Sequence, residues 1–460
     1  MAITLRPYQQ EGLEKIRERF RSGDRAVLYQ CATGAGKGVL MAYMARAAAE
    51  NGKRAMFVVH RDYLLTQSSK LFSDLGVNHG VIAPQYTTTR EPIQIASIMT
   101  LIRRMEKFPE QDLLIFDEAH RTLANSHMRV VHQWPKARIV GLTASPQRLD
   151  GKPLGDVYQS IVEGPSMRWL IDQGFLSDFE IYAPPSPGLD MSGVKTRFGE
   201  YDQIEAERRV NKPTITGSAV EHYKKLLNGK RAVVFCHGIK HSRDVVADFN
   251  SAGVRAAHID GTMDRFERRT ILASFARGET LVLSNVNLVI EGFDLPSVEG
   301  VILLRATQSI VIFLQSIGRA LRPAPGKTKA IILDHVNATA THGFPDDPRD
   351  WNLDGVQRGK RDSDGPLIRV EQCERCFFVF ERGPEFCPAC AHVHTQKTRK
   401  IEFVDGELAQ LTREQVEAAK RSRRIEQGSA RTLEDLRSLA KTKGYKPGWA
   451  ERVFAGRRRG

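Results

Sequence analysis

A short segment with two glycines and a lysine has the residue types of a phosphate-binding loop. Between an apolar run and a stretch with helical periodicity lie Thr33, Gly34, Ala35, Gly36 and Lys37. Two glycines let the backbone turn so tightly that its N–H groups point at phosphate oxygens, and the lysine and the start of a helix add positive charge. A glycine-rich turn is the plainer alternative, but this strand–loop–helix context favours a nucleotide site.

The residue after the lysine departs from the usual pattern of such loops. That position normally supplies a serine or threonine hydroxyl to Mg²⁺, and here it is Gly38. Phosphate binding is retained, because backbone N–H groups and Lys37 supply those contacts. We expect Mg²⁺ to be held by other groups.

Two adjacent carboxylates, Asp117 and Glu118, follow the apolar run Leu113–Phe116. The carboxyl ends of strands are where open α/β sheets bind ligands. We predict that Asp117 holds Mg²⁺ and that Glu118 orients and polarises an attacking water molecule. Such a pair is often only structural, but its position in the same domain as a phosphate loop favours hydrolysis.

Four cysteines form two CxxC pairs, Cys373 with Cys376 and Cys387 with Cys390. This spacing is typical of a tetrahedral Zn²⁺ site. So small a segment has little core, and metal binding would supply its folding free energy. The spacing predicts a zinc ribbon over residues 368–395. The other two cysteines, Cys31 and Cys236, are expected to be small buried residues.

Apolar runs that alternate with helical segments must position these groups, and the alternation occurs twice. Strand–helix alternation of this kind indicates parallel sheets covered on both faces. The first set of predicted strands is Ala26–Tyr29, Ala55–Val59, Ile93–Ile98, Leu113–Phe116 and Arg138–Leu142, with helices at Lys37–Glu50 and Tyr63–Leu75. The second set is Ala232–Cys236, Arg255–Ile259, Leu281–Val286, Val301–Leu304 and Ala330–Leu333, with helices at Ser242–Ser251, Arg265–Ala276 and Ile310–Ala320.

The predicted fold class is therefore α/β, with two tandem parallel-sheet domains, a small zinc ribbon and a basic helical tail. We expect domain 1 at residues 1–165 and domain 2 at residues 214–340, separated by a linker over 166–213 that is irregular from Pro184 to Pro213. A second linker over 341–367 precedes the ribbon, and the tail covers 396–460. Within the tail, Thr432 begins a short helix that ends near Gly444, and a second helix follows from Pro447 to Phe454.

The charge balance favours a polyanionic partner. The chain has 460 residues, 41% of them hydrophobic, and a net charge of +14. Residues 391–460 contribute 17 lysines and arginines against 9 acidic residues. The first 20 residues lack a secretory signal, and no apolar run reaches the roughly 18 residues of a membrane span. We therefore expect a cytoplasmic protein that binds nucleic acid.

The motifs together resemble those of superfamily 2 helicases and translocases of the DEAH type, over residues 3–336. The matching segments are Leu5–Gln9, the phosphate loop, Asp117–His120, Gly141–Pro146, Gly292–Asp294 and Gln315–Arg322. The resemblance implies two RecA-like motor domains with ATP bound between them. One departure is Ser145, where threonine is more usual.

The same resemblance implies roles for individual residues. Lys37, Arg319 and Arg322 would act on the triphosphate during catalysis, the arginines from across the interdomain cleft. Nucleotide-binding positions would be Gln9 as the adenine reader, Thr33 to Gly38, Gly292 and Asp294. Coupling positions would be His120, Thr143, Ser145 and Gln315. Nucleic-acid contacts would come from His60, Arg61, Gln67, Thr100, His237, His258 and Gly261.

Within the superfamily, the chain looks most similar to duplex-DNA motors of the XPB-like, RadD-type and restriction classes, in a compact layout found in phages and prophages. The expected partner is DNA, single-stranded, duplex or branched, and the tail offers a surface for a protein partner. Three functions stay open. They are an ATP-driven helicase or branch-remodelling translocase, the motor half of a restriction-type system, and a nucleotide-responsive adaptor whose hydrolysis is weakened by Gly38. No nuclease signature is present, and intact Glu118, Arg319 and Arg322 argue against the adaptor.

Overall fold

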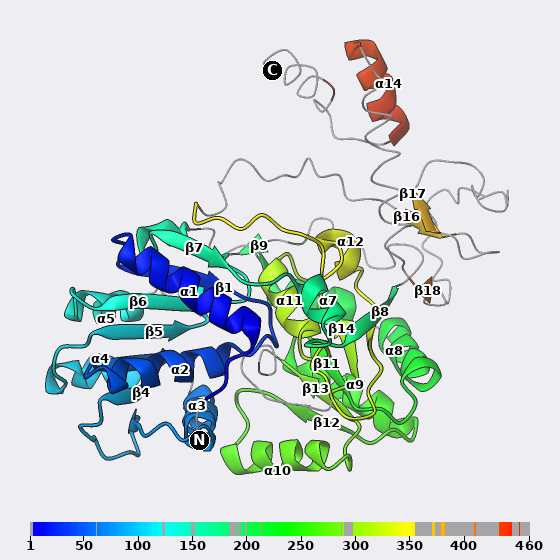
Figure 1. The fold of residues 1–460 in the computed structure, drawn as a ribbon. Coiled ribbons are helices and arrows are strands. Elements are labelled where there is room, and N and C mark those ends of the chain that lie inside the picture. Colours follow the sequence, from blue (N-terminus) through cyan, green and yellow to red (C-terminus); the bar gives the residue numbers. More distant parts are fainter. Residues whose placement is uncertain are drawn as a thin grey trace.

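The computed structural model describes residues 3–60, 62–121, 125–148, 152–183, 191, 194, 196–197, 200–211, 213–286, 288, 298–354, 370–372, 379–381, 409–410, 432–443 and 450. Two sheets lie side by side, the first in blue to cyan and the second in green to yellow (Figure 1). Among the described residues, no helix is both long and apolar enough to cross a membrane.

The first sheet has seven parallel strands in the order β3-β4-β2-β5-β6-β1-β7. Its strands are β1 (Ala26–Gln30), β2 (Ala55–Val59), β3 (Gly80–Ile82), β4 (Ile93–Ser97), β5 (Leu113–Asp117), β6 (Arg138–Thr143) and β7 (Ser160–Glu163). Its helices are α1 (Pro7–Arg21), α2 (Lys37–Glu50), α3 (Asp62–Asp74), α4 (Ile98–Arg104), α5 (Asn125–Gln133) and α6 (Met167–Asp172), with short 3₁₀ turns η1 (Met105–Lys107), η2 (Ala119–Arg121) and η3 (Leu154–Asp156).

Both faces of the first sheet are buried, which explains why its strands are continuous apolar runs. Successive residues of a strand point to opposite faces. Val27 and Tyr29 of β1 accordingly join one core cluster, whereas Ala26 and Leu28 join another. This pattern is typical of parallel sheets covered by helices on each side.

The second sheet also has seven strands, in the order β12-β13-β11-β14-β15-β8-β18, and only the β18–β8 pairing is antiparallel. Its strands are β8 (Asp178–Ala183), β11 (Ala232–Cys236), β12 (Ala256–Ile259), β13 (Val282–Asn285), β14 (Gly300–Leu304), β15 (Lys329–Asp334) and β18 (Ala409–Gln410). Its helices are α7 (Gln203–Val210), α8 (Pro213–Leu226), α9 (Ile239–Ser251), α10 (Arg265–Ala276), α11 (Ile310–Ile317) and α12 (Ala338–His342). The two predicted parallel-sheet domains are confirmed.

The segment 166–213, predicted as a linker with an irregular part from Pro184 to Pro213, contains regular elements and a strand of the second sheet. The segment contains α6, the strand β8 that pairs with β15, a two-stranded ribbon of β9 (Thr196–Arg197) and β10 (Glu200–Tyr201), and α7. The strand β8 escaped sequence analysis because half-exposed residues interrupt its apolar pattern. We call residues 173–211 the connector from here on.

The chain beyond α12 is described only in part. Residues 343–354 return to domain 1, where the carbonyl of Leu353 accepts a hydrogen bond from Gly155 N at 3.0 Å. Strands β16 (Val370–Gln372) and β17 (Val379–Glu381) form an antiparallel pair. Helix α14 (Leu433–Lys443) begins as predicted, since Asp435 N donates to Thr432 Oγ1 and Thr432 N donates to Asp435 Oδ2. The helix predicted from Pro447 lies outside the described residues.

Candidate active site

The phosphate loop joins β1 to α2 and depends on its two glycines. Gly34 and Gly36 have φ values of +89° and +78°, which are left-handed conformations that favour glycine. A Cβ on Gly36 would lie 2.7 Å from Gln9 Nε2, and one on Gly34 would lie 2.9 Å from Leu176 Cδ2. The loop is therefore closely packed between α1 and the connector.

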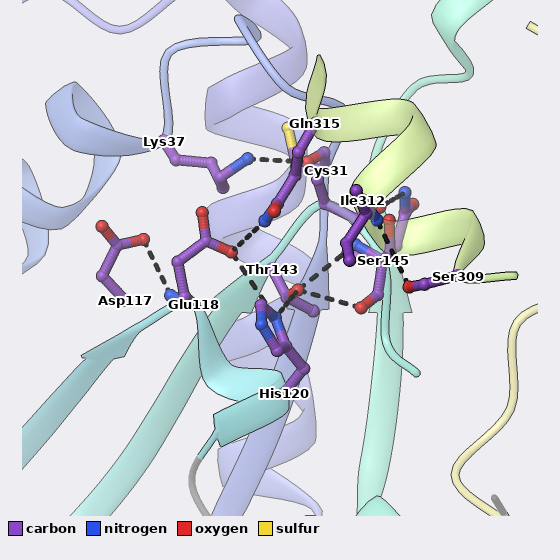
Figure 2. Close-up of polar contacts among 12 residues, drawn as sticks. Cys31, Lys37, Asp117, Glu118, His120, Thr143, Ser145, Ser309, Ile312 and Gln315 are labelled. Carbon is purple, nitrogen blue, oxygen red and sulfur yellow. Dashed lines mark hydrogen bonds and ion pairs between the residues drawn. The ribbon is translucent and has the colours of Figure 1, made fainter. Parts of the chain in front are cut away.

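Lys37 lies at the first position of α2 and folds back over the loop. Its Nζ donates to the carbonyls of Cys31, at 3.1 Å, and Ala32, at 3.4 Å (Figure 2). Carbonyl oxygens are weak partners for an ammonium compared with phosphate oxygens. The lysine is thus held where an incoming phosphate would attract it.

Gly38 has a packing reason to be glycine. A Cβ at this position would lie 2.6 Å from Leu71 Cδ2 of α3, closer than side chains approach each other. The close contact between α2 and α3 therefore accounts for the missing hydroxyl. The atom in the way is the end of a flexible side chain, so a small substituent needs only a shift of Leu71.

The first segment of the chain contacts the same loop. Gln9 Nε2 donates to the carbonyl of Gly36 at 3.1 Å, and Gln9 Oε1 accepts from Arg6 N at 2.9 Å. Tyr8 Oη donates to the carbonyl of Ala35 at 3.0 Å. Both side chains are buried. Gln9 is therefore at the nucleotide loop, and its reading of adenine stays a prediction.

Asp117 lies at the carboxyl end of β5 and has the environment of a cation ligand. Its Oδ1 accepts from Glu118 N at 2.9 Å. Burial, and then the charge of Glu118, raise the pKa of Asp117 above its ordinary value, while Lys37 opposes the shift. No described cation forms an ion pair with it. A hard dication such as Mg²⁺ prefers carboxylate oxygens and would offset this unfavourable burial of charge, so the residue fits that ion.

Glu118 has an unusual backbone, and its carboxylate points across the site toward the second domain (Figure 2). Its φ of +50° is in the left-handed region, which is costly for a residue with a side chain. Glu118 Oε2 accepts from Nε2 of Gln315 in α11 at 3.1 Å, and His120 Nδ1 lies 3.5 Å from the same oxygen. Groups from both domains thus hold the carboxylate in place.

A chain of polar contacts leads from this carboxylate through His120 to the end of β6. Thr143 Oγ1 donates to the carbonyl of Ser145 at 3.1 Å and accepts from Ser145 N at 3.2 Å. Thr143 Oγ1 also forms a hydrogen bond with His120 Nδ1, 3.2 Å away. All three residues are buried.

The segment that follows α11 packs directly on the phosphate loop. A Cβ on Gly318 would lie 2.7 Å from Thr33 Cβ, and Arg322 Cγ lies 3.8 Å from the place where a Cβ of Gly34 would be. Arg319 is buried, and its charge acts on Asp117. Burial lowers the pKa of Arg322. Both predicted arginines are thus brought to the loop.

The predicted nucleic-acid contacts are less exposed than expected. Thr100 and His237 are buried, and His258 holds Ser242 Oγ at 2.6 Å and Asp260 Oδ2 at 2.7 Å through its two ring nitrogens. Gly261 is exposed, and His60 and Gln67 are half-buried. These roles stay predictions. Several predicted positions lie outside the described residues: Arg61, Gly292, Asp294, Cys373, Cys376, Cys387 and Cys390.

Sequence analysis missed the connector residues that line this site. Leu176 packs over Gly34, Ser177 bonds to the arginine segment, and Glu200 bonds to the start of α11. The Asp202–Glu205 spacing was an available signal for a helix start, and Asp202 does cap α7 by accepting from Glu205 N.

Comparisons with known proteins agree with this geometry. A family model described as "Type III restriction enzyme, res subunit" matches residues 2–148, and one described as "Helicase conserved C-terminal domain" matches residues 218–324. A 51.5 kDa protein of a Lactococcus phage (isolate 7-9) is 30% identical over 392 residues, which are 85% of this chain and 83% of the relative.

Two further comparisons each cover about three quarters of this chain. The Saccharomyces cerevisiae protein named "Putative ATP-dependent helicase IRC3" is 26% identical over 361 residues, covering 74% of this chain but only 52% of that protein. The fragment structure of a "putative HsdR subunit of a type I restriction enzyme" from Vibrio vulnificus YJ016 superposes with a TM-score of 0.59 at 22% identity, covering 74% of this chain and 65% of that chain. The second likeness is one of fold.

Proposed function

Because this chain belongs to the superfamily 2 helicases and is an ATP-hydrolysing enzyme of that family, we propose that it is a motor that moves along or remodels DNA. The observation that carries the proposal is the hydrogen bond from Gln315 to Glu118, which joins one domain to the hydrolytic carboxylate of the other. A site divided between two domains changes when they separate, so hydrolysis and domain motion are linked.

The residues divide the work of hydrolysis as follows. Backbone N–H groups of the loop and Lys37 bind the β- and γ-phosphates of ATP. Glu118 orients the attacking water and accepts its proton. Arg319 and Arg322 stabilise negative charge on the transferred phosphoryl group. Asp117 would hold Mg²⁺, which neutralises phosphate charge when it is bound.

The hydrogen-bonded chain at β6 is suited to transmit the state of the site. His120 contacts the hydroxyl of Thr143, and that hydroxyl is bonded to both the N–H and the carbonyl of Ser145. A change at Glu118 would therefore alter the backbone after β6. We assign these residues to the coupling of hydrolysis to movement.

DNA is the track that the chemistry supports best. The net charge of +14 favours a polyanion, and His60, Gln67 and Gly261 offer partly or fully exposed positions on both domains. The motifs resemble those of XPB-like and RadD-type motors, which act on duplex DNA. The restriction-subunit family model and the HsdR likeness favour a second candidate, the motor subunit of a restriction-type system.

We further propose that the four clustered cysteines bind one Zn²⁺. The first pair, Cys373 and Cys376, falls in sequence between β16 and β17, which form a small antiparallel pair. Two CxxC pairs are a spacing typical of structural Zn²⁺ sites. The basic tail beyond it is a candidate surface for DNA or for a protein partner.

ATP turnover tests the proposed function. Purified protein is assayed alone and with single-stranded DNA, duplex DNA, forked DNA and RNA, with Glu118→Gln as the matched inactive control. The proposal expects turnover to rise with at least one DNA and to be lost in the variant. Stimulation by RNA alone would overturn DNA as the track. Absence of ATP turnover with every nucleic acid would overturn the motor function.

A further inference from the structure

The start of α11, the helix that precedes Arg319 and Arg322, is held by a carboxylate of the connector. Glu200 Oε1 accepts from Thr307 Oγ1 at 2.8 Å, Gln308 N at 2.7 Å and Ser309 N at 3.0 Å. Its other oxygen lies 3.6 Å from Arg305 Nη2. A carboxylate at a helix start satisfies N–H groups that have no partner within the helix. Glu200 thus holds Gln308 and Ser309 just before α11, and the Ser309 hydroxyl caps the helix itself by accepting from Ile312 N at 3.3 Å.

The far end of the same segment is held by Ser177. Ser177 N donates to the carbonyl of Leu321 at 2.8 Å, and Ser177 Oγ donates to the carbonyl of Arg322 at 3.3 Å. Lys327 Nζ also donates to the Arg322 carbonyl, at 2.8 Å. The backbone at the second arginine therefore has one anchor within its own domain and one in the connector.

The connector crosses between the domains next to this anchor. Phe175 contacts Tyr8 of α1, with ring centroids 5.0 Å apart. The side chain of Leu176 packs over Gly34, so closely that a Cβ there would lie 2.9 Å from Leu176 Cδ2. The next residue, Ser177, bonds to the arginine segment, and β8 then joins the second sheet. Leu176, which contacts the phosphate loop, is thus followed directly by Ser177, which bonds to backbone carbonyls of the arginine segment.

We propose that Leu176, Ser177 and Glu200 are positioning residues for ATP hydrolysis, which hold the segment from α11 to Arg322 in register against the phosphate loop. This inference rests on the proposed motor function. None of the three touches the reacting atoms; they act through Arg319, Arg322 and Gln315. Movement of Gly34 on nucleotide binding would pass through Leu176 to the backbone of Arg322 without waiting for the whole domain to move.

The rate of hydrolysis depends on how precisely the two arginines are placed. An arginine stabilises a transition state only from the correct place, and small displacements cost large factors in rate. Gly318, Arg319 and Ala320 stay tied to the last turn of α11, because their N–H groups donate to the carbonyls of Leu314, Ser316 and Ile317. The place of Arg322 therefore depends on α11, which Glu200 holds at its start, and on Ser177 at its own backbone.

The test compares Ser177→Ala and Glu200→Gln in the full chain. Each variant is assayed for kcat and KM of ATP with a stimulating DNA, and for binding of a fluorescent ATP analogue. We expect kcat to fall about 3- to 10-fold, as for loss of one hydrogen bond in Ser177→Ala or of the charge that strengthens three hydrogen bonds in Glu200→Gln, while analogue binding changes less than about 2-fold. Ser177→Thr, which keeps the hydroxyl, should restore most of the rate.

Coupling to the arginine separates positioning from general destabilisation. In an Arg322→Ala background, Ser177→Ala should add little further loss, because the group it positions is gone. Glu180→Gln is the matched control, since Glu180 is in β8 and bonds to Tyr182 and Lys329 rather than to α11; its kcat should equal that of the wild type. A wild-type kcat in both Ser177→Ala and Glu200→Gln would overturn this inference but not the motor function. The same holds if Ser177→Ala lowers kcat by the same factor with Arg322 present and with Arg322→Ala. Absence of turnover in the wild type would overturn the motor as well.

Discussion

Gln315 Nε2 and Glu118 Oε2 are 3.1 Å apart although they belong to different domains. Glu118 has a left-handed backbone, and such strain persists only where surrounding contacts hold it. His120 supplies one such contact and Gln315 the other. The hydrolytic carboxylate is therefore oriented by both domains, and opening the cleft removes one of its two side-chain partners.

Glu118→Gln should abolish most turnover without preventing binding. Glutamine keeps the shape and can still bond to Gln315, but it cannot accept a proton from water. We expect ATP hydrolysis at least about 100-fold slower, with unchanged affinity for a nucleotide analogue and for DNA. Glu106→Gln, which changes an exposed carboxylate of domain 1, is the control. Turnover within a few-fold of the wild type would contradict the assignment.

Sequence reasoning was most successful where local patterns carry the structure. Helices Lys37–Glu50 and Arg265–Ala276 and strands Ala55–Val59 and Ala232–Cys236 have the bounds that were predicted. Buried parallel strands are continuous apolar runs, and the loop glycines have backbone conformations that few other residues adopt. The phosphate loop and the carboxylates after β5 lie where strand ends place them.

The connector could not be predicted in the same way. The strand β8 is defined by pairing with β15, a partner some 150 residues away in sequence. Glu200 is important because of the backbone N–H groups it meets at the start of α11, and no spacing in the sequence reports such a contact. The strained φ of Glu118 is likewise a consequence of tertiary contacts rather than of residue type.

Acid should destabilise the protein partly through His335. Burial, and then the nearby His222, lower the pKa of His335 to about 3, whereas an unfolded histidine has a pKa of about 6.5. Only the unfolded chain binds the proton between these values. Above about pH 6.5 neither state binds this proton, and His335 does not reduce the free energy of unfolding. As the pH falls from about 6.5 toward about 3, protonation of the unfolded chain lowers the free energy of unfolding.

Urea unfolding at pH 7, 6 and 5 measures this effect. His335→Gln should reduce the dependence of the free energy of unfolding on pH by up to about 1.4 kcal/mol per pH unit below about pH 6. His132→Gln changes an exposed ring and should leave the dependence as it is. The same pH slope in wild type and His335→Gln would show that this ring does not titrate as inferred.

The zinc proposal predicts one metal ion per chain. Cys376→Ser or Cys387→Ser should lose the metal, because a tetrahedral thiolate site does not tolerate removal of a ligand. ATP turnover of the motor domains should survive. Elemental analysis after purification without chelator measures the metal, and Cys236→Ser, which alters a buried cysteine of β11, is the control. Zinc-free wild-type protein would rule the site out.

Gly38 should raise the Mg²⁺ concentration that the protein needs for ATP turnover. A hydroxyl at this position would give Mg²⁺ a direct oxygen ligand, whereas glycine leaves that place to water. Asp117 and the phosphates should still retain the ion with lower affinity. Gly38→Ser should therefore lower the Mg²⁺ concentration that gives half-maximal ATP turnover. Its Cβ requires Leu71 to move, because it would lie 2.6 Å from Leu71 Cδ2.

A pair of variants separates the metal effect from the packing effect. Leu71→Ala makes room without adding a hydroxyl, so alone it should leave the Mg²⁺ requirement unchanged. Gly38→Ser combined with Leu71→Ala should show the larger decrease, and Gly38→Ala in the same background is the control without oxygen. Thermal shifts do not distinguish these effects, because replacing glycine in a helix stabilises it by up to about 1 kcal/mol. If the wild type is inactive at saturating Mg²⁺ with every nucleic acid while the serine variants turn over ATP, the adaptor function is correct and the motor is not.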